Sequence, residues 1–193
     1  MARGIARDHA EKRAAIRKGA AAYFAAHGYD RASMTGAAKH CGVSKALIYH
    51  YYDSKEDLLF DILQAHLSAL MATVEKVGQG PDYLRRMIRA ILMAYRAADA
   101  EHKLQADALG TLPADKRAPL LALQRRLVKA MDKALLQASP ALQETPEQLR
   151  ALTMAVYGML NWFYMWHRPG KGVSREEYAD LVTDLVLGGV KGL

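Results

Sequence analysis

The sequence lacks most features of exported, membrane-spanning and disulfide-stabilised proteins. Its single cysteine, Cys41, excludes an internal disulfide bond and fits a reducing compartment. The N-terminal segment MARGIARDHAEKR is charged and has no apolar centre, unlike a secretory signal. The apolar runs at 155–166 and 181–186 are broken by polar residues or glycine and fall short of the roughly 20 apolar residues that cross a bilayer. These absences predict a cytoplasmic protein that does not enter a membrane.

Motifs of the common enzyme classes are absent as well. The chain has no glycine-rich phosphate loop, no Gly-x-Ser-x-Gly nucleophile turn and no His-Glu-x-x-His zinc motif. Cys41, His40 and His50 form the one group that resembles metal ligands, but their spacing fits no standard site. We therefore expect Cys41 to be structural, and we expect no enzyme activity, no catalytic residue, no metal and no cofactor.

The chain also lacks any stretch of four or more residues with clean alternation of apolar β-branched positions, which argues against β-strands. Helix-forming residues dominate instead, so the predicted fold class is all-α. Capping residues, glycines and prolines divide the chain into separate helices. The predicted ranges are about 8–27, 34–41, 45–52, 55–77, 82–98, 101–110, 116–138, 146–167 and 174–190.

Positive charge is concentrated in the first quarter of the chain. Residues 1–55 hold ten Lys and Arg against four Asp and Glu, whereas the remaining residues are almost neutral. This distribution is expected if the first quarter faces a polyanion such as DNA. A solvated basic surface would have the same composition, so charge alone leaves both interpretations open.

Two short predicted helices, 34–41 and 45–52, are joined by a tight turn at Gly42. This is the organisation of a helix-turn-helix, whose second helix enters the major groove of DNA. At about 100° per residue the second helix separates into two sides. The side predicted to pack inward carries Ile48, Tyr51 and Tyr52. The side predicted to face outward carries Lys45, Ala46, Tyr49 and His50.

The segment GYDRASMTGAAKHCGVSKALIYHYYDSKEDLL, residues 28–59, resembles the DNA-binding head of the TetR family of bacterial transcriptional regulators. The likeness rests on several separated features, such as Gly-Tyr, Gly-Val-Ser and Ser-Lys-Glu, and covers about residues 8–63. The sequence departs from the family pattern at two places. Gly36-Ala37 replaces a polar residue and Ile, which we expect to loosen the second helix. Tyr52 replaces the usual Phe, and its hydroxyl needs a partner or solvent.

The resemblance implies which residues contact DNA. Lys45 and Tyr49 resemble readers of base edges, and the small Ala46 lets the backbone approach the groove. The residues that resemble phosphate contacts are Thr35, Ser44, His50, Tyr51 and Lys55. Because a lysine at position 45 can equally reach a phosphate, its role stays open. The family also implies a homodimer on a roughly palindromic double-stranded DNA operator.

The predicted domains are a helix-turn-helix DNA-binding domain at 1–54 and a ligand-binding and dimerisation domain at 55–193. TetR-type regulators pair their last two long helices across a dimer, and the apolar stripes of 146–167 and 174–190 suit this. The predicted interface residues are Leu152, Val156, Met159, Phe163, Leu181 and Leu185. The predicted residues of a mostly apolar effector pocket are Met93, Tyr95, His102, Leu127, Met131, Tyr157, Asn161, Trp162 and Trp166. Ordinary core packing would use the same residue types.

The preferred hypothesis is a ligand-responsive, dimeric DNA-binding repressor that a small, largely apolar effector releases from its operator. The segment 161–190 resembles regulators of lipid, steroid or aromatic-acid catabolism, several of which respond to acyl-CoA thioesters. A sequence-independent, nucleoid-type DNA-binding protein is the alternative, and an enzyme or carrier with an incidental basic end is a third hypothesis. The sequence names neither the effector nor the operator, and it does not decide between repressor and activator.

Overall fold

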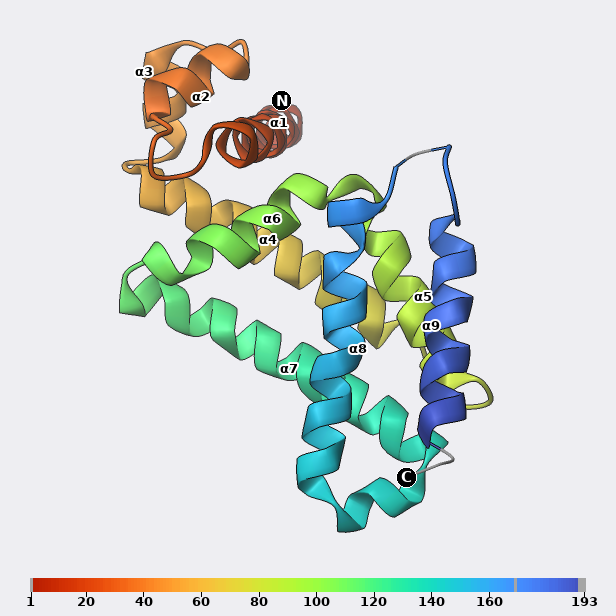
Figure 1. Ribbon diagram of the computed structural model, residues 1–193. Coiled ribbons are helices and arrows are strands. Elements are labelled where there is room, and N and C mark those ends of the chain that lie inside the picture. Colours follow the sequence, from red (N-terminus) through yellow and green to blue (C-terminus); the bar gives the residue numbers. More distant parts are fainter. Residues whose placement is uncertain (1, 169, 191–193) are drawn as a thin grey trace. The chain divides into compact units, whose positions relative to one another are not determined.

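The computed structural model describes residues 2–168 and 170–190, and most of them are helical (Figure 1). Within that part of the chain no β-strand forms, apart from an isolated antiparallel bridge between Arg168 and Lys171. The predicted all-α fold class is therefore confirmed. The α-helices are α1 (Ala2–His27), α2 (Met34–His40), α3 (Lys45–Tyr51), α4 (Lys55–Glu75), α5 (Tyr83–Ala94), α6 (Asp99–Ala108), α7 (Ala114–Ala138), α8 (Pro146–Trp166) and α9 (Arg175–Val190). Short 3₁₀ helices are η1 (Tyr95–Ala97), η2 (Leu109–Thr111) and η3 (Pro140–Glu144).

The helix boundaries agree with the predicted ranges except at a few places. The first helix, α1, begins at Ala2 rather than near Asp8. Two exposed ion pairs support its first turns: Arg7 pairs with Glu11 at 2.9 Å and Asp8 with Lys12 at 2.8 Å, each four residues apart on one face. The predicted helix 82–98 ends its α-helical part at Ala94, and η1 completes it. The 3₁₀ helix η3 was not predicted.

Serine side chains cap four of the described helices, α2, α3, α4 and α9; at the start of α4, Ser54 Oγ accepts from the Asp57 amide at 3.0 Å. Ser33 accepts a hydrogen bond from the Gly36 amide at the start of α2, and Ser44 accepts one from the Leu47 amide at the start of α3. At the start of α9, Ser174 Oγ accepts from the Glu177 amide at 3.1 Å, while a Glu177 carboxylate oxygen accepts from the Ser174 amide at 2.7 Å. This reciprocal pair is a capping box, which satisfies amides that the helix itself leaves without partners.

The described residues form two compact units, and α4 and α7 each contribute to both. The first unit contains residues up to 67 together with 100–120, and the second contains 68–99 together with the residues from 121 onward. The first unit is thus larger than the predicted 1–54 domain, since it includes the first part of α4 and all but the first residue of α6. Compactness does not test which residues bind DNA, so the predicted domain boundary remains a prediction.

The core of the first unit forms where α2 and α3 pack against α1. Phe24 and Ile48 are fully buried, and Tyr52 is 4 % exposed, which confirms the predicted inward side of the helix after Gly42. Gly42 has φ +66°, a left-handed conformation that glycine adopts without strain. The chain then continues with the Val43 amide donating to the Ala38 carbonyl at 3.0 Å. This bond closes the turn between α2 and α3.

The ring of Tyr23 occupies the space beside Gly36 of α2. A Cβ atom at position 36 would lie 2.0 Å from the Tyr23 hydroxyl oxygen and 2.6 Å from Cζ. The Tyr23 ring is itself confined, with its centroid 4.4 Å from that of His27 and 5.7 Å from that of His40. The packing of α1 against α2 therefore leaves no room for a side chain at position 36, and the expected loosening of α2 stays a prediction.

The second unit has a core of α5, α8 and α9, and Figure 1 shows α5 and α9 side by side. Ile88 and Ile91 of α5 and Val182 of α9 are buried. Arg85 of α5 forms ion pairs with Asp180, at 3.0 Å, and with Asp184 on the facing side of α9. The unit is thus held by an apolar seam with a charged edge.

The first turn of α9 is anchored by a buried arginine. Arg175 is 8 % exposed, and its guanidinium donates to the Asp99 carboxylate at 3.0 and 3.3 Å. It also lies 4.9 Å from the centre of the Phe163 ring. This geometry combines an ion pair with a cation–π contact, so the charge is compensated although the side chain is buried.

One described helix, α4, is long and apolar enough to cross a membrane by length and composition alone. More than half of its apolar window, 56 %, is buried inside the structure. Core helices of globular proteins pass the same test, and Leu58, Leu59 and Leu63 of α4 are fully buried. The observation is weak evidence for a membrane span.

Substituting Gly36 with Ala should destabilise the protein by about 1–3 kcal/mol, because the new methyl group overlaps a confined tyrosine ring. Urea unfolding followed by circular dichroism measures this change. Gly110→Ala is the matched control, since a Cβ there meets nothing within 4 Å, and it should change stability by less than about 1 kcal/mol. Equal stabilities of the two variants would contradict the packing role of Gly36.

Candidate nucleic-acid interface

The outward side of α3 carries the predicted base readers. Lys45, Ala46, Tyr49 and His50 are all exposed, and Tyr49 is 42 % exposed although it is a large aromatic residue. The Lys45 ammonium lies 5.8 Å from the centre of the Tyr49 ring. An exposed aromatic side chain beside a cation offers apolar surface and hydrogen-bond donors on one helix face, which suits the edge of a DNA groove.

The predicted phosphate contacts Thr35 and Ser44 both lie at helix starts. Thr35 is exposed in the first turn of α2, and Ser44 is the exposed N-cap of α3. The Ser44 oxygen accepts from the Leu47 amide at 3.0 Å, and its own hydroxyl proton remains available to donate. The amides at the start of a helix favour a nearby anion, so both hydroxyls lie where a phosphate oxygen would be bound well.

Tyr51 is half-buried, because the first turns of α1 lie against it. Its hydroxyl donates to the His9 carbonyl at 3.4 Å, and its ring centroid lies 4.6 Å from that of His9. The exposed ring of His50 is 5.5 Å from the Tyr51 ring. His9 was not among the residues predicted from the sequence. Local patterns carry no signal for it, since its proximity to α3 comes from tertiary packing.

Lys55 has a structural role that the sequence did not indicate. Its ammonium donates to the carbonyls of Tyr29 at 3.0 Å, Ala32 at 3.2 Å and Asp30 at 3.4 Å, and it lies 4.4 Å from the centre of the Tyr29 ring. A lysine ammonium has three protons to donate, so these three carbonyls use them all. Lys55 therefore holds the turn between α1 and α2. Its predicted phosphate contact would require at least one of these bonds to break.

The hydroxyl of Tyr52 has a protein partner. It donates to Asp61 Oδ2 on α4 at 2.6 Å, inside the first unit. Burial, together with this hydrogen bond, raises the pKa of the Tyr52 phenol. The Asp61 carboxylate therefore satisfies the hydroxyl that departs from the family pattern. Asp61 was not among the residues predicted from the sequence.

The predicted dimer residues fall on different sides of α8 and α9. Val156 and Phe163 are buried within their own unit, at 0 % and 1 % exposure, while Leu152 and Met159 are half-buried. The prediction placed all four in the interface, and the burial of Val156 and Phe163 within the unit contradicts it for those two. The exposed large apolar side chains of α8 are Met154, Trp162, Met165 and Trp166, and those of α9 are Leu181 and Leu185.

The prediction fails for Val156 and Phe163 because α8 is apolar on nearly all of its sides. Its central residues offer two stripes of similar hydrophobicity, one through Val156 and Phe163 and the other through Met154 and Trp162. The sequence pattern locates the helix, and only the packing of its neighbours decides which stripe is covered. In the structure, the stripe through Trp162 remains uncovered.

The predicted effector residues do not form one group. Tyr95, Leu127 and Met131 are buried in the second unit, with Met93, Tyr157 and Asn161 half-buried there. Trp162 and Trp166 are 62 % and 44 % exposed, so they do not line an interior. His102 belongs to the first unit.

Two tyrosines of this set are fixed by hydrogen bonds. The Tyr95 hydroxyl donates to Asn161 Oδ1 at 3.1 Å, and the Tyr157 hydroxyl donates to the Leu127 carbonyl at 2.9 Å. Burial raises the pKa of both phenols, so both remain donors at neutral pH. The structure thus brings Tyr95, Asn161, Tyr157 and Leu127 together as polar pairs within an apolar interior.

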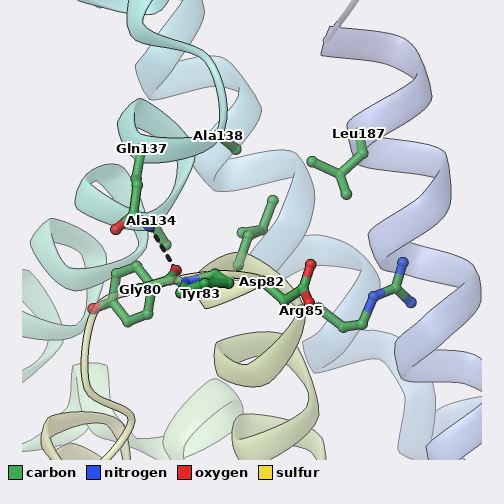
Figure 2. A pocket seen from close by; sticks show the side chains of 10 residues that line it. Gly80, Asp82, Tyr83, Arg85, Ala134, Gln137, Ala138 and Leu187 are labelled. Carbon is green, nitrogen blue, oxygen red and sulfur yellow. Dashed lines mark hydrogen bonds between the residues drawn. The ribbon is translucent and has the colours of Figure 1, made fainter.

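A pocket of about 200 Å³ opens on the second unit, between the start of α5 and the ends of α7 and α9. Figure 2 shows Gln137 of α7 reaching the backbone at Gly80, to whose carbonyl its amide donates at 2.7 Å, with Leu187 of α9 on the other side. Pockets for drug-sized ligands usually measure about 300–1,000 Å³. None of the predicted effector residues lines this pocket, and its size suits only a small molecule.

A second pocket, of about 480 Å³, lies within the first unit where the end of α1 faces α6. Its rim carries both signs of charge, with Arg31 and Lys103 opposed by Asp30 and Asp107. The Lys103 ammonium already donates to the Ala25 carbonyl at 2.9 Å. This pocket also contains none of the predicted effector residues.

Two buried histidines, His66 of α4 and His102 of α6, lie against each other in the first unit. Their ring centroids are 6.1 Å apart, and the side chains are 9 % and 4 % exposed. Burial, and then the nearby His102 and Lys18, lower the pKa of His66 to about 4. His66 is therefore neutral at physiological pH.

Two family profiles match the chain, one in its first third and one over most of the rest. The profile of the bacterial regulatory proteins of the tetR family matches residues 16–62, and that of the tetracyclin repressor-like C-terminal domain matches residues 78–190. A TetR-family transcriptional regulator from Bordetella parapertussis 12822 has a similar structure, with 33 % identity and a TM-score of 0.86, over 94 % of this chain and 96 % of that chain.

Two further relatives carry more specific names. The structure of AibR in complex with isovaleryl coenzyme A and operator DNA is similar with a TM-score of 0.79 and 26 % identity, over 90 % of this chain and 97 % of that one. The HTH-type transcriptional repressor KstR2 of Rhodococcus jostii (strain RHA1) is 25 % identical over 177 residues, which cover 89 % of this chain and 87 % of the relative.

Acidification should destabilise the protein through His66. The folded pKa of about 4 lies below the ordinary value of 6.5, so the folded state binds fewer protons than the unfolded state between these two pH values. The stabilisation that a neutral His66 gives the folded state is present above about pH 6.5. It is lost as the pH falls toward 4, which lowers the unfolding free energy by up to about 3 kcal/mol. Urea unfolding at pH 7, 5.5 and 4 measures this loss.

His66→Gln should reduce the pH dependence of the unfolding free energy over this range, because the titrating group is gone. His40→Gln, which removes an exposed histidine, is the control. If the wild type and His66→Gln lost stability equally on acidification, the burial of a neutral His66 would not be the cause.

Proposed function

Because the chain belongs to the TetR family of bacterial regulatory proteins, we propose that it is a dimeric transcriptional repressor that binds operator DNA and is released from it by a small-molecule effector. The observation that carries the proposal is the outward side of α3. There Lys45, Tyr49 and His50 are exposed in a helix whose opposite side is buried.

Electrostatics favours DNA as the partner of the first unit. Residues 1–55 carry ten basic and four acidic side chains, and two of the acidic ones, Asp8 and Glu11, are paired with Lys12 and Arg7. A positively charged surface attracts the phosphate backbone over a Debye length and gives affinity that falls with salt concentration. The exposed hydroxyls of Thr35 and Ser44 then add short-range contacts that fix the register of the helix on the duplex.

We assign base recognition to the exposed side of α3. Tyr49 can place its ring against a thymine methyl group, and Lys45 can donate to guanine O6 or N7. Lys45 can also reach a phosphate, and both roles fit its exposed position. Ala46 keeps the helix surface low between these two side chains. The relatives reported above are named as regulators, so the alternative of a sequence-independent nucleoid protein gains no support from them.

A homodimer fits the uncovered side of α8 and α9. Met154, Trp162 and Met165 of α8 and Leu181 and Leu185 of α9 expose large apolar surface, which a soluble monomer rarely leaves in one region. Two copies related by a twofold axis would bury the same surface on each partner. The proposed interface therefore replaces Val156 and Phe163 of the sequence prediction with Met154, Trp162 and Met165.

The effector class we propose is an acyl-CoA thioester or a related apolar catabolite. The support is the likeness to AibR, whose structure contains isovaleryl coenzyme A, and the apolar interior of the second unit around Met131 and Tyr95. We propose no enzymatic activity, since the relatives are regulators, and we place the protein in the cytoplasm, where its operator would be.

Specific DNA binding should depend on Tyr49. Selection from a random duplex library with the wild type should enrich a roughly palindromic site, and Tyr49→Ala should weaken binding to that site about tenfold or more, because a base contact contributes about 1–3 kcal/mol. Binding to non-specific duplex should change much less. Fluorescence anisotropy with labelled duplexes measures both affinities.

Lys55→Met is the comparison variant, because the Lys55 ammonium binds backbone carbonyls of the protein itself. It should lower the unfolding free energy and leave the salt dependence of operator binding unchanged, whereas losing a phosphate contact would reduce the salt slope by about 1.

In the same assay, isovaleryl-CoA is the probe for release and should weaken operator binding. Failure to enrich any site would contradict the proposed function.

Leu185→Glu should dissociate the dimer while leaving each protomer folded. Leu185 is 62 % exposed in the protomer, so a charge there costs little in the monomer but would be buried in the proposed interface, twice per dimer. Analytical ultracentrifugation should show a dimer for the wild type and for the exposed α7 control Ala122→Glu. A Leu185→Glu variant that remains dimeric would place the interface elsewhere.

A further inference from the structure

A single buried carboxylate connects three helices of the first unit. Asp61 of α4 is 8 % exposed, and its Oδ2 accepts the Tyr52 hydroxyl at 2.6 Å. The Arg13 guanidinium of α1 binds both oxygens, with Nε 3.1 Å from Oδ2 and Nη2 3.0 Å from Oδ1. Arg17, one turn further along α1, approaches Oδ2 at 3.5 Å. Asp61 therefore joins α1, α4 and the residue that ends α3.

Tyr52 lies where it can set the direction of α3. It is the C-cap of that helix, with φ −144° and ψ 122°, and its amide donates to the Ile48 carbonyl. The side chain is only 4 % exposed, so little solvent can reach its hydroxyl to replace Asp61 as the partner. Ser44 fixes the other end of the same helix. Both ends of this seven-residue segment are thus held by side-chain hydrogen bonds.

The hydrogen bond between Tyr52 and Asp61, at the C-terminal end of α3, is strong because its acceptor is charged. A hydroxyl that donates to a buried carboxylate forms a charge-assisted hydrogen bond, which is shorter and stronger than one between neutral groups. Arg13 and Arg17 compensate the carboxylate, and their side chains are 48 % and 31 % exposed, so solvent screens their share of the interaction. The side chains of Tyr52 and Asp61 are far less exposed than those of the arginines, so solvent screens their hydrogen bond less, and Tyr52 is the residue that ends α3.

We propose that Tyr52 and Asp61 are positioning residues for DNA recognition: their hydrogen bond fixes the orientation of α3 and so the placement of Tyr49 and Lys45 in the groove. This inference rests on the proposed function, because it concerns the same DNA contact. Neither residue touches DNA in this arrangement. Both are buried, and they act through the helix that carries the exposed side chains.

The alternative is that the bond stabilises the fold without affecting recognition. The two roles differ in what Tyr52→Phe does. The variant keeps the ring that fills the core and loses only the hydroxyl, and Phe at this position agrees with the family pattern, so the chain should fold. A purely structural role would lower specific and non-specific DNA binding in proportion to the folded fraction. A positioning role would lower specific binding selectively.

The experiment compares wild type and Tyr52→Phe on two duplexes, the site selected by the wild type and a non-specific sequence. Specific affinity should fall about tenfold, which is the lower range for losing a hydrogen bond to a charged group, while non-specific affinity changes less than about twofold. The slope of affinity against salt should be unchanged, because the phosphate contacts remain. Tyr178→Phe, which removes a hydroxyl bonded to the Met159 carbonyl in the second unit, is the control.

Dependence on Asp61 is tested in a double-mutant cycle with Asp61→Leu. If Tyr52 acts through Asp61, adding Tyr52→Phe to Asp61→Leu should cause no further loss of specific affinity. Hydrogen exchange gives a second measurement that does not require Asp61→Leu to fold: the amides of 48–52 should exchange about tenfold faster in Tyr52→Phe, with those of α2 unchanged.

The possible failures are distinguishable. A wild type that selects no DNA site contradicts the proposed function. A wild type that binds its site specifically, together with a Tyr52→Phe variant of equal specific affinity and equal exchange at 48–52, overturns the positioning role alone. Additive effects in the cycle would show that Tyr52 does not act through Asp61.

Discussion

A helix of seven residues is too short to persist alone in water, and α3 is such a helix. Its conformation therefore depends on what surrounds it: the Ser44 cap at one end, the fully buried Ile48 in the middle and the Tyr52–Asp61 hydrogen bond at the other end. Because Ile48 and Tyr52 fix the helix from its buried side, the residues of the opposite side are not needed for packing and can contact a binding partner. The exposure of Tyr49 is possible for this reason.

Both departures from the family pattern are compensated by residues distant in sequence. The missing side chain at Gly36 is matched by the Tyr23 ring of α1, whose hydroxyl lies where a Cβ would be. The added hydroxyl at Tyr52 is matched by Asp61 of α4. In each case a helix of the head gains a specific contact with a longer helix. A substitution that looks unfavourable locally can thus be neutral or favourable once its partner is present.

Local patterns sufficed for the fold class, for most helix ranges, for the serine caps and for the inward side of α3, because capping and helical periodicity act within a few residues. They failed where tertiary packing decides. On α8, which is apolar on nearly all sides, the stripe through Val156 was mistaken for the interface, although it is buried within the unit. The structural role of Lys55 was not predicted, because the carbonyls that it binds come from a turn more than twenty residues earlier. His9 and Asp61 could not be found for the same reason.

The two units alternate along the chain, and this limits where segments can be exchanged with another regulator to make a hybrid protein. Since residues 100–120 belong to the first unit, and α4 and α7 each contribute to both units, no single cut separates the two units. A hybrid protein joined after residue 54 would take α3 without Asp61, the residue that holds its last turn. A transplant that keeps the first unit intact has to carry residues up to 67 and bring the 100–120 segment with them.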